Sequence, residues 1–270
     1  MAKNTLMICI LMMVSAASLT PAAAHEFWVA PQDYTPLQGN QVVVALKNGQ
    51  RMKGADYPYL SDRFQSFTIT TRQGTRRAQG MDGDIPALTF IARQPGLHII
   101  AYHSKPLRIT YVTFDEFAKY LDYEGLGNIA AEHQKRGLPQ SGFSERYIRC
   151  AKGLIQVGPV GAKDRDRPTG LPFELVATVN PYVAGINKLP VLLLWQGKPV
   201  AGRQISVFRR NAATVTRSIV FTDKAGRAEI PLTGGGTFLL NAVNFEALED
   251  GRVLWQSHWA SLTFNLPSQN

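Results

Sequence analysis

The segment SHWASLTFNL, residues 257–266, alternates between two kinds of side chain. The two sets of alternate positions are Trp259, Ser261 and Thr263 against Ala260, Leu262 and Phe264. Successive side chains of a β-strand point to opposite faces of its sheet, so this period of two predicts a strand whose two faces meet different surroundings. A chain built from such segments is mostly β.

Runs of the same kind precede this segment from about residue 171, and turn residues separate them. They are KLPVLLLW (188–195), RQISVFRR (203–210), RSIVFTD (217–223), RAEIPL (227–232) and GTFLLNAVNF (236–245). Turns are predicted at Gly197–Pro199 and at Asp223–Gly226. The second turn lacks the oxygen ligands of a calcium loop because Lys224 and Arg227 stand where two of them would be needed. These runs predict a C-terminal β-sandwich over residues 171–267.

The first half of the chain shows the same rhythm, with turns every eight to twelve residues. Its runs are QVVVALKNG (41–49), FQSFTITTRQG (64–74), ALTFIARQPG (87–96), LHIIAYHSKP (97–106) and RITYVTF (108–114), and GFSERYIRCAKGLIQVG (142–158) returns to the same pattern. This predicts an N-terminal β-sandwich over residues 25–165. The expected fold is therefore two immunoglobulin-like β-sandwiches joined by the linker GAKDRDRPTGLP, residues 161–172.

Residues 113–137 break the β pattern. Phe114, Phe117 and Leu121 recur at helical spacing, Thr113 is a candidate N-cap, and glycines interrupt the segment at positions 125 and 127. We expect two short helices whose apolar side chains pack on the N-terminal sandwich. His133, near the basic end of the segment, is expected to face solvent as a C-terminal charge.

The first 24 residues form a candidate secretory signal peptide. Lys3 precedes a short apolar run, and Ala22–Ala24 supply small residues for cleavage. The apolar run is shorter than the roughly 20 residues that a spanning helix needs, and no later segment approaches that length. We therefore expect export to the periplasm in a form that does not span the membrane. Cleavage leaves Cys150 as the one cysteine, expected to be a buried and inert thiol.

The formal net charge of +9 becomes +8 when the leader and its single lysine are removed. The basic residues are scattered, and the densest clusters, TRQGTRR (71–77) and KDRDR (163–167), have the composition of solvent-facing loops. A nucleic-acid partner is therefore not predicted.

Cleavage after Ala24 would make His25 the first residue of the mature chain. A free α-amine and an imidazole on one residue can chelate one metal ion, and their reference pKa values, about 8 and 6.5, allow both to bind near neutral pH. Nitrogen donors suit nickel, cobalt, copper or zinc rather than calcium. A transition-metal ion is the predicted partner.

Further candidate ligands are His98, His103 and His258. His98 and His103 lie five residues apart in one predicted strand, which places them on opposite faces unless a bulge intervenes. His258 lies beside Trp259 and could be a packed aromatic or a ligand. No nucleophile elbow, HExxH helix, P-loop or paired-cysteine zinc motif occurs, so no catalytic residue and no enzymatic activity are predicted.

Several motifs together resemble the periplasmic NikK-like family, a domain of unknown function associated with nickel and cobalt uptake. They are HEFWVAP (25–31), FAKYLDYEGL (117–126), SERYIRCAKGL (144–154), GKPVAG (197–202), TDKAGRAEIPL (222–232) and WASLTF (259–264). The resemblance implies an exported β-rich protein that helps to deliver nickel or cobalt to a membrane transporter, with His25 as a ligand. It also covers positions for which it implies no role: Trp28, Glu145, Tyr147, Arg149 and Lys152.

The motifs GKPVAG and TDKAGRAEIPL are also similar to those of transthyretin-like and carboxypeptidase-regulatory-like modules, which implies a structural role for the C-terminal unit. Two other functions compete with metal delivery. A copper histidine-brace enzyme also begins with histidine, but it needs a second histidine close to the first. A structural or binding β-sandwich would retain no metal after purification.

Overall fold

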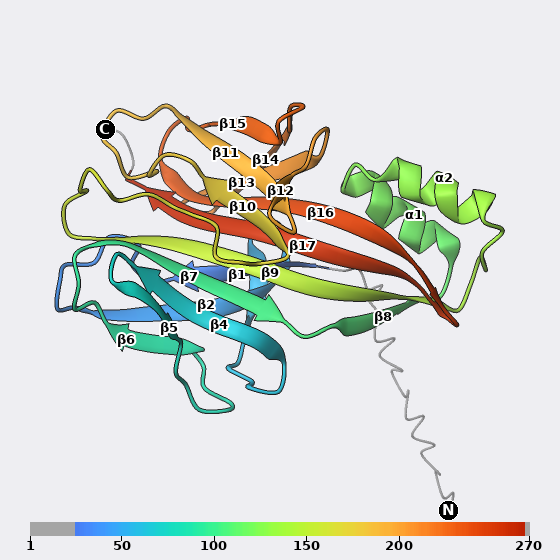
Figure 1. Ribbon diagram of the computed structural model, residues 1–270, viewed down its shortest axis with the longest axis horizontal. Coiled ribbons are helices and arrows are strands. Elements are labelled where there is room, and N and C mark those ends of the chain that lie inside the picture. Colours follow the sequence, from blue (N-terminus) through green and yellow to red (C-terminus); the bar gives the residue numbers. More distant parts are fainter. Residues whose placement is uncertain (1–24, 268–270) are drawn as a thin grey trace, which may run out of the picture.

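The computed structural model describes residues 25–267, and strands make up most of their regular structure. Figure 1 shows a long central sheet with a smaller sheet on each side of it and two helices beside one end. The sheets are not closed into a barrel. The predicted mostly β, sandwich-like fold is confirmed, whereas the predicted signal peptide lies outside the described residues.

The central sheet has the strand order β14-β13-β16-β17-β9-β7-β4-β5, with β8 pairing with β9. Its strands are β4 (Phe64–Thr71), β5 (Gly74–Arg77), β7 (Gly96–Ser104), β8 (Leu107–Tyr111), β9 (Phe143–Val157), β13 (Gln204–Asn211), β14 (Thr214–Phe221), β16 (Gly236–Asp250) and β17 (Val253–Leu266).

The parallel pair β17 and β9 joins the two halves of the chain, with Trp259 opposite Arg149 and Thr263 opposite Gly153. All other strand pairs of the described residues are antiparallel. The predicted linker lies between β9 and the next strand, and strands from both of its sides enter this one sheet.

Each smaller sheet covers one face of the central sheet. The first, called sheet A here, contains β1 (Glu26–Pro31), β2 (Gln41–Gln50), β3 (Lys53–Tyr57) and β6 (Leu88–Ile91). The second, called sheet C, contains β10 (Phe173–Ala177), β11 (Lys188–Trp195), β12 (Lys198–Pro199) and β15 (Arg227–Pro231). The two faces of β17 contact different sheets. Ala260, Leu262 and Phe264 enter the core under sheet C, whereas Ser261 and Thr263 form hydrogen bonds with β1 of sheet A.

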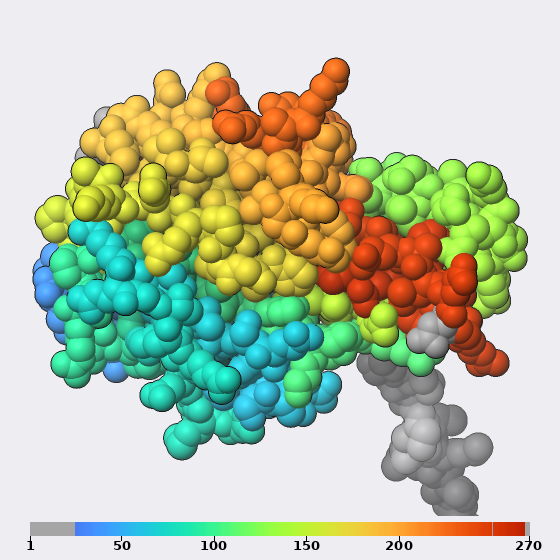
Figure 2. All heavy atoms as spheres, viewed as in Figure 1, coloured from blue at the N-terminus to red at the C-terminus, as the bar shows by residue number. Residues whose placement is uncertain are grey.

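The two predicted helices are α1 (Phe114–Tyr123) and α2 (Gly127–Lys135). Thr113 is the N-cap of α1, since its side chain accepts a hydrogen bond from the Glu116 backbone N–H. Gly125 lies between the helices at φ 69°, a conformation that favours glycine. Figure 2 shows the helices as a narrower lobe at one end of the molecule.

The helical core differs from the expectation in one respect. Phe117 and Leu121 are fully buried, but they pack against Trp255 and Trp259 of β17 as well as against Phe143 of β9. The helices therefore cover strands from both halves of the chain.

The expectation that His133 faces solvent is wrong. Its side chain is completely buried, Trp255 Nε1 donates a hydrogen bond to His133 Nδ1 at 3.0 Å, and His133 Nε2 lies 2.9 Å from the Pro139 carbonyl oxygen. Burial lowers the pKa of His133, which favours the neutral ring that can accept one of these bonds and donate the other.

The segment KDRDR is also not a fully solvated loop. Asp164 and Asp166 are buried, while the basic residues between and beside them are exposed. Asp164 pairs with Arg72 at 2.7 Å, and Asp166 pairs with Lys152 at 2.8 Å. Partners far away in the sequence therefore fix this segment on the central sheet.

No helix within residues 25–267 is long and apolar enough to cross a membrane.

Candidate functional site

The start of β1 is held firmly on the central sheet. Ser261 Oγ donates a hydrogen bond to the Phe27 carbonyl at 2.7 Å, and Thr263 Oγ1 donates one to the Val29 carbonyl at 2.5 Å. Val29 also lies close over Gly153 of β9, where a Cβ would meet Val29 Cγ1 at 2.7 Å. These contacts fix the backbone directly after His25.

His25 is half-buried beside Arg149. Its pKa is lowered, first by burial and then by the Arg149 charge, so its imidazole is neutral near pH 7 and can act as a ligand. The Arg149 guanidinium lies over the rings of Phe27 and Tyr147, at 4.9 and 5.2 Å, and donates to Asn48 Oδ1 at 2.8 Å. Arg149 is thus fixed by its own contacts and needs no carboxylate partner.

Two buried carboxyl groups lie near this end of β1. Glu26 is 2% exposed and accepts a hydrogen bond from the Arg51 backbone N–H at 2.9 Å. Burial raises the pKa of Glu26 to about 7. Glu124, directly after α1, has its pKa raised to about 8 by burial and then by the Glu26 charge. Asn241 Nδ2 donates to Glu124 Oε2 at 3.3 Å.

The charge of Arg217 acts on both acids, but its hydrogen bonds go to other groups. Its guanidinium lies 3.8 Å from the centre of the Tyr123 ring and donates to the Tyr123 carbonyl and to Ser206 Oγ at 2.7 and 2.9 Å. Within residues 25–267 it forms no salt bridge with Glu26 or Glu124. The corner, called the N-terminal seam here, comprises Glu26, Glu124, Arg217 and Asn241, next along the chain to His25.

His103 and His258 lie on the opposite face of the central sheet, which sheet C covers. In register they stand beside Cys150 and Ile148 of β9, two core residues of that face. Burial, followed by the His103 charge, lowers the pKa of His258 to about 4. His103 Nε2 and His258 Nδ1 are buried without a hydrogen-bond partner in the described part of the chain.

Polar groups on β16 and β17 surround the other nitrogen of His258. Its Nε2 lies 2.9 Å from Gln256 Nε2 and 3.3 Å from Glu246 Oε2, and the ring meets Trp195 edge-on with centroids 4.5 Å apart. The contacts with Gln256 and Trp195 position the imidazole, while its Nδ1 stays without a partner among residues 25–267.

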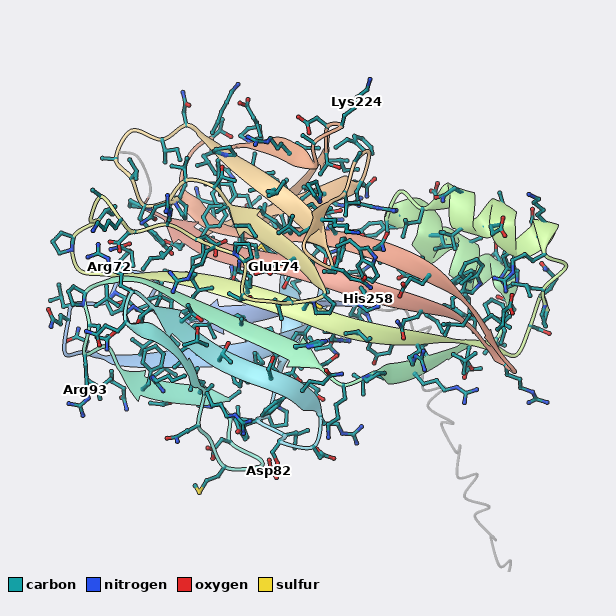
Figure 3. The ribbon with its side chains drawn as sticks, viewed as in Figure 1. Arg72, Asp82, Arg93, Glu174, Lys224 and His258 are labelled. Carbon is teal, nitrogen blue, oxygen red and sulfur yellow. The ribbon has the colours of Figure 1, made fainter. Side chains whose placement is uncertain are left out.

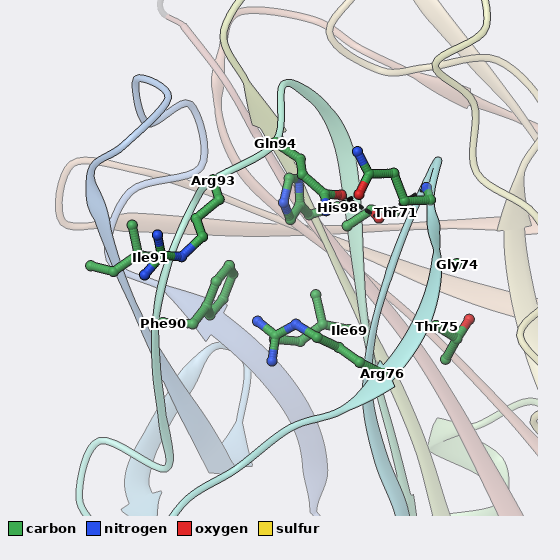
Figure 4. Close-up of a pocket in the computed structure, with 11 residues that line it drawn as sticks. Ile69, Thr71, Gly74, Thr75, Arg76, Phe90, Ile91, Arg93, Gln94 and His98 are labelled. Atoms are coloured by element: carbon green, nitrogen blue, oxygen red, sulfur yellow. Dashed lines mark hydrogen bonds between the residues drawn. The ribbon is translucent and has the colours of Figure 1, made fainter.

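His98 lies in a third place, a cavity of about 490 Å³ between sheet A and the central sheet (Figure 4). Its ring stacks on Phe90 with centroids 6.0 Å apart, and its Nδ1 lies 3.2 Å from the Gly96 carbonyl oxygen. Arg76 and Arg93 line the same cavity. The expectation that His98 and His103 face opposite sides of their strand is confirmed.

The four predicted metal ligands thus occupy three separate places. Two of these places are far apart in Figure 3. Arg93, which lines the cavity of His98, lies at one end of the molecule, and His258 lies nearer its middle. Among the described residues, no three His, Cys, Asp or Glu side chains are arranged to hold a metal ion.

Sequence reasoning missed both acids of the seam. Glu26 interrupts an otherwise apolar strand start, which is the signal that could have identified it, whereas Glu124 reads as an ordinary helix-end residue. Cys150, in contrast, is buried as expected, and burial raises the pKa of its thiol to about 12.

The chain belongs to the family described as a domain of unknown function, DUF4198, whose model matches residues 22–246. A search of curated proteins finds no match.

Proposed function

We propose that this chain is an exported, non-catalytic metal-binding protein whose mature form begins at His25 and binds nickel or cobalt there. It would act as an accessory to a membrane transporter for that metal, in the manner of the NikK-like proteins that its motifs resemble. Copper and zinc are the alternative cargo ions. In this proposal residues 171–267 correspond to the transthyretin-like module and serve as structural support.

The observation that carries the proposal is the position of His25 at the head of an anchored strand. Because hydrogen bonds from Ser261 and Thr263 hold β1, the α-amine of a chain cleaved after Ala24 would stand at a fixed point beside the half-buried imidazole. A chelate whose two donors are already positioned loses little conformational entropy on binding.

The surroundings of His25 favour a metal ion that binds reversibly and can pass to another protein. The fixed positive charge of Arg149 opposes a cation and so weakens the retention of a bound ion. Two nitrogen donors leave further coordination positions to water or to the protein that receives the metal. Such a site suits delivery better than storage.

A copper histidine brace is supported less well. It requires a second imidazole beside the amino-terminal one, but His103 and His258 face sheet C. His98 stands opposite Ile155, six residues along β9 from Arg149, the neighbour of His25. Binding without oxidative chemistry is therefore the function we propose.

The test compares the mature chain, a form with one extra alanine before His25, and His25→Ala. Nickel, cobalt and copper are titrated calorimetrically into each at one pH near 7. We expect both changes to weaken binding by more than the roughly 10- to 100-fold typical of an outer-shell change, because each removes a donor atom. The double variant His103→Ala/His258→Ala is the matched control and should bind as the mature chain does.

Equal affinity of the mature and alanine-extended forms would show that the amine is not a ligand and would refute the proposal. The starting residue is checked separately by intact mass of the exported protein. A mature chain that keeps Ala24 would have the same consequence.

A further inference from the structure

Lys152 is enclosed with two acids beneath sheet C. Its Nζ lies 2.8 and 2.9 Å from the two carboxylate oxygens of Asp166 and 3.0 Å from Glu174 Oε1. The side chains of Lys152 and Asp166 have no exposed surface, and that of Glu174 is 2% exposed. Figure 3 shows Glu174 near the middle of the molecule.

We propose that Lys152 and Asp166 become joined by an intramolecular isopeptide bond, with Glu174 as the group that moves the proton. In this step the Nζ–Cγ bond forms, one C–O bond of the Asp166 carboxyl group breaks, and one water molecule leaves. The reaction needs no oxidant, cofactor or other reactant. It involves only described residues and does not depend on metal binding.

The positions of the atoms favour attack on the carboxyl carbon. Because Nζ is almost equally distant from both Asp166 oxygens, it lies close to the plane that bisects the carboxyl group and contains Cγ. The backbone N–H of Ala177 donates to Oδ2 at 2.9 Å, and that of Arg167 donates to Oδ1 at 2.8 Å. Two fixed donors would stabilise the negative charge that develops on these oxygens during attack.

The protons required for the reaction can be present in the closed site. One ammonium and two carboxylates carry a net charge of −1, and burial of an uncompensated charge is unfavourable, so uptake of one proton is favoured. Burial accordingly raises the pKa of Asp166. The uncharged combination of an amine and two carboxylic acids contains the same number of protons and is the reactive form.

Glu174 is placed to transfer the proton. Its Oε1 contacts Lys152 Nζ, and the backbone N–H and the hydroxyl of Thr169 each donate to Oε1 at 2.8 Å, which fixes its orientation. As a carboxylic acid it would give its proton to an Asp166 oxygen during attack, take a proton from Nζ in exchange, and pass that proton to the departing hydroxyl as water forms.

The bond would attach the linker covalently to the centre of the sheet. Lys152 lies on β9, next to Leu262 of β17 in register, and Asp166 lies in the connection that leads to sheet C. A cross-link of this kind limits the freedom of the unfolded chain as a disulfide does. Within the described residues, Cys150 is the one cysteine and offers no disulfide.

The experiment is mass spectrometry of the purified folded full chain and of its tryptic digest under denaturing conditions. We expect the chain to be lighter than its sequence by one water molecule, trypsin not to cleave after Lys152, and one branched peptide to contain both Lys152 and Asp166. The branched peptide makes the result independent of where the mature chain begins.

Variants test each role. Asp166→Asn should lose ammonia instead of water, and Asp166→Ala should have the full sequence mass. Glu174→Gln should also keep the full mass, because an amide cannot accept the proton. Wild-type protein of full mass, cleaved normally after Lys152, would overturn the proposal, and a cross-linked Glu174→Gln protein would overturn the role of Glu174.

Discussion

The two faces of the central sheet bury ionisable groups in different ways. On the face under sheet C, Lys152 lies between Asp166 and Glu174, so a buried cation directly contacts buried acids. On the other face, Glu26, Glu124 and Glu145 are buried with no salt bridge to a basic side chain among the described residues.

The cause of this difference is the way in which each face is covered. Sheet C covers its face as one layer, whereas the opposite face is shared by sheet A and the helices. The N-terminal seam lies where β1 begins and α1 ends, between two separate apolar clusters. Buried acids without cations favour their neutral form, so the acids of the second face should lower stability as pH rises, and this face is the one that can accept a cation.

The largest effect should come from removing the centre of the helical cluster. Phe117 has no exposed surface, and its ring lies 4.8 Å from that of Tyr111 and 5.3 Å from that of Phe143. Phe117→Ala should lower the free energy of unfolding by about 3–5 kcal/mol, because apolar contacts are lost and a cavity remains. Chemical denaturation measures the loss.

Metal affinity at His25 should be unchanged in the fraction of Phe117→Ala that folds. Phe114→Ala, at the half-buried start of the same helix, is the matched control and should cost clearly less. If Phe117→Ala had no effect on denaturation, the helical lobe would not contribute a core of its own.

The strands and helices were largely predictable because their signals are local. The alternation in residues 257–266 predicted β17, and helical spacing with a candidate cap predicted α1 and α2. The parallel pairing of β17 with β9 was not predictable, since Trp259 and Arg149 are far apart in sequence and no local pattern states which strands become neighbours.

Burial of polar residues was the least predictable feature for the same reason. Asp166 reads as part of a charged loop, and its burial depends on Lys152 in the preceding strand and on Ala177 in the following one. His133 reads as a helix-end charge, and its burial depends on Trp255. For the site, position 25 could be chosen from the sequence, but the approach of Glu124 to Glu26 depends on how α1 meets the sheet.

A second prediction uses the pH dependence of stability to test the buried acids on the face that sheet A and the helices cover. Glu145 is fully buried, and burial raises its pKa from 4.5 to about 7 although Ser257 and Tyr111 donate hydrogen bonds to it. At Glu145 the folded state therefore binds more protons than the unfolded state between these values, so the contribution of this residue to stability should fall as pH rises from about 4.5 to about 7 and then level off. The difference of about 2.5 pKa units corresponds to about 3 kcal/mol.

Glu145→Gln should remove that part of the decline, whereas Glu26 and Glu124 should still contribute to it. Urea denaturation at pH 5 and pH 8 measures the change for wild type and variant. Glu249→Gln, an exposed change on β16, is the control and should decline as wild type does. A Glu145→Gln protein whose stability changes between pH 5 and pH 8 by the same amount as that of wild type would contradict the neutral state of buried Glu145.

The smallest effect concerns the cap of α1, which tests whether the helical lobe depends on its core or on local helix signals. The Glu116 backbone N–H donates to Thr113 Oγ1 at 3.3 Å, so Thr113→Ala leaves one backbone donor without its partner. We expect a loss of about 1 kcal/mol in the free energy of unfolding, well below that of Phe117→Ala, because the buried aromatic cluster continues to hold the helix. Thr113→Ser keeps an acceptor oxygen and should restore most of the loss in the same denaturation experiment. A serine variant as unstable as the alanine variant would show that the methyl group of Thr113, and not its hydroxyl, is what stabilises this end of the lobe.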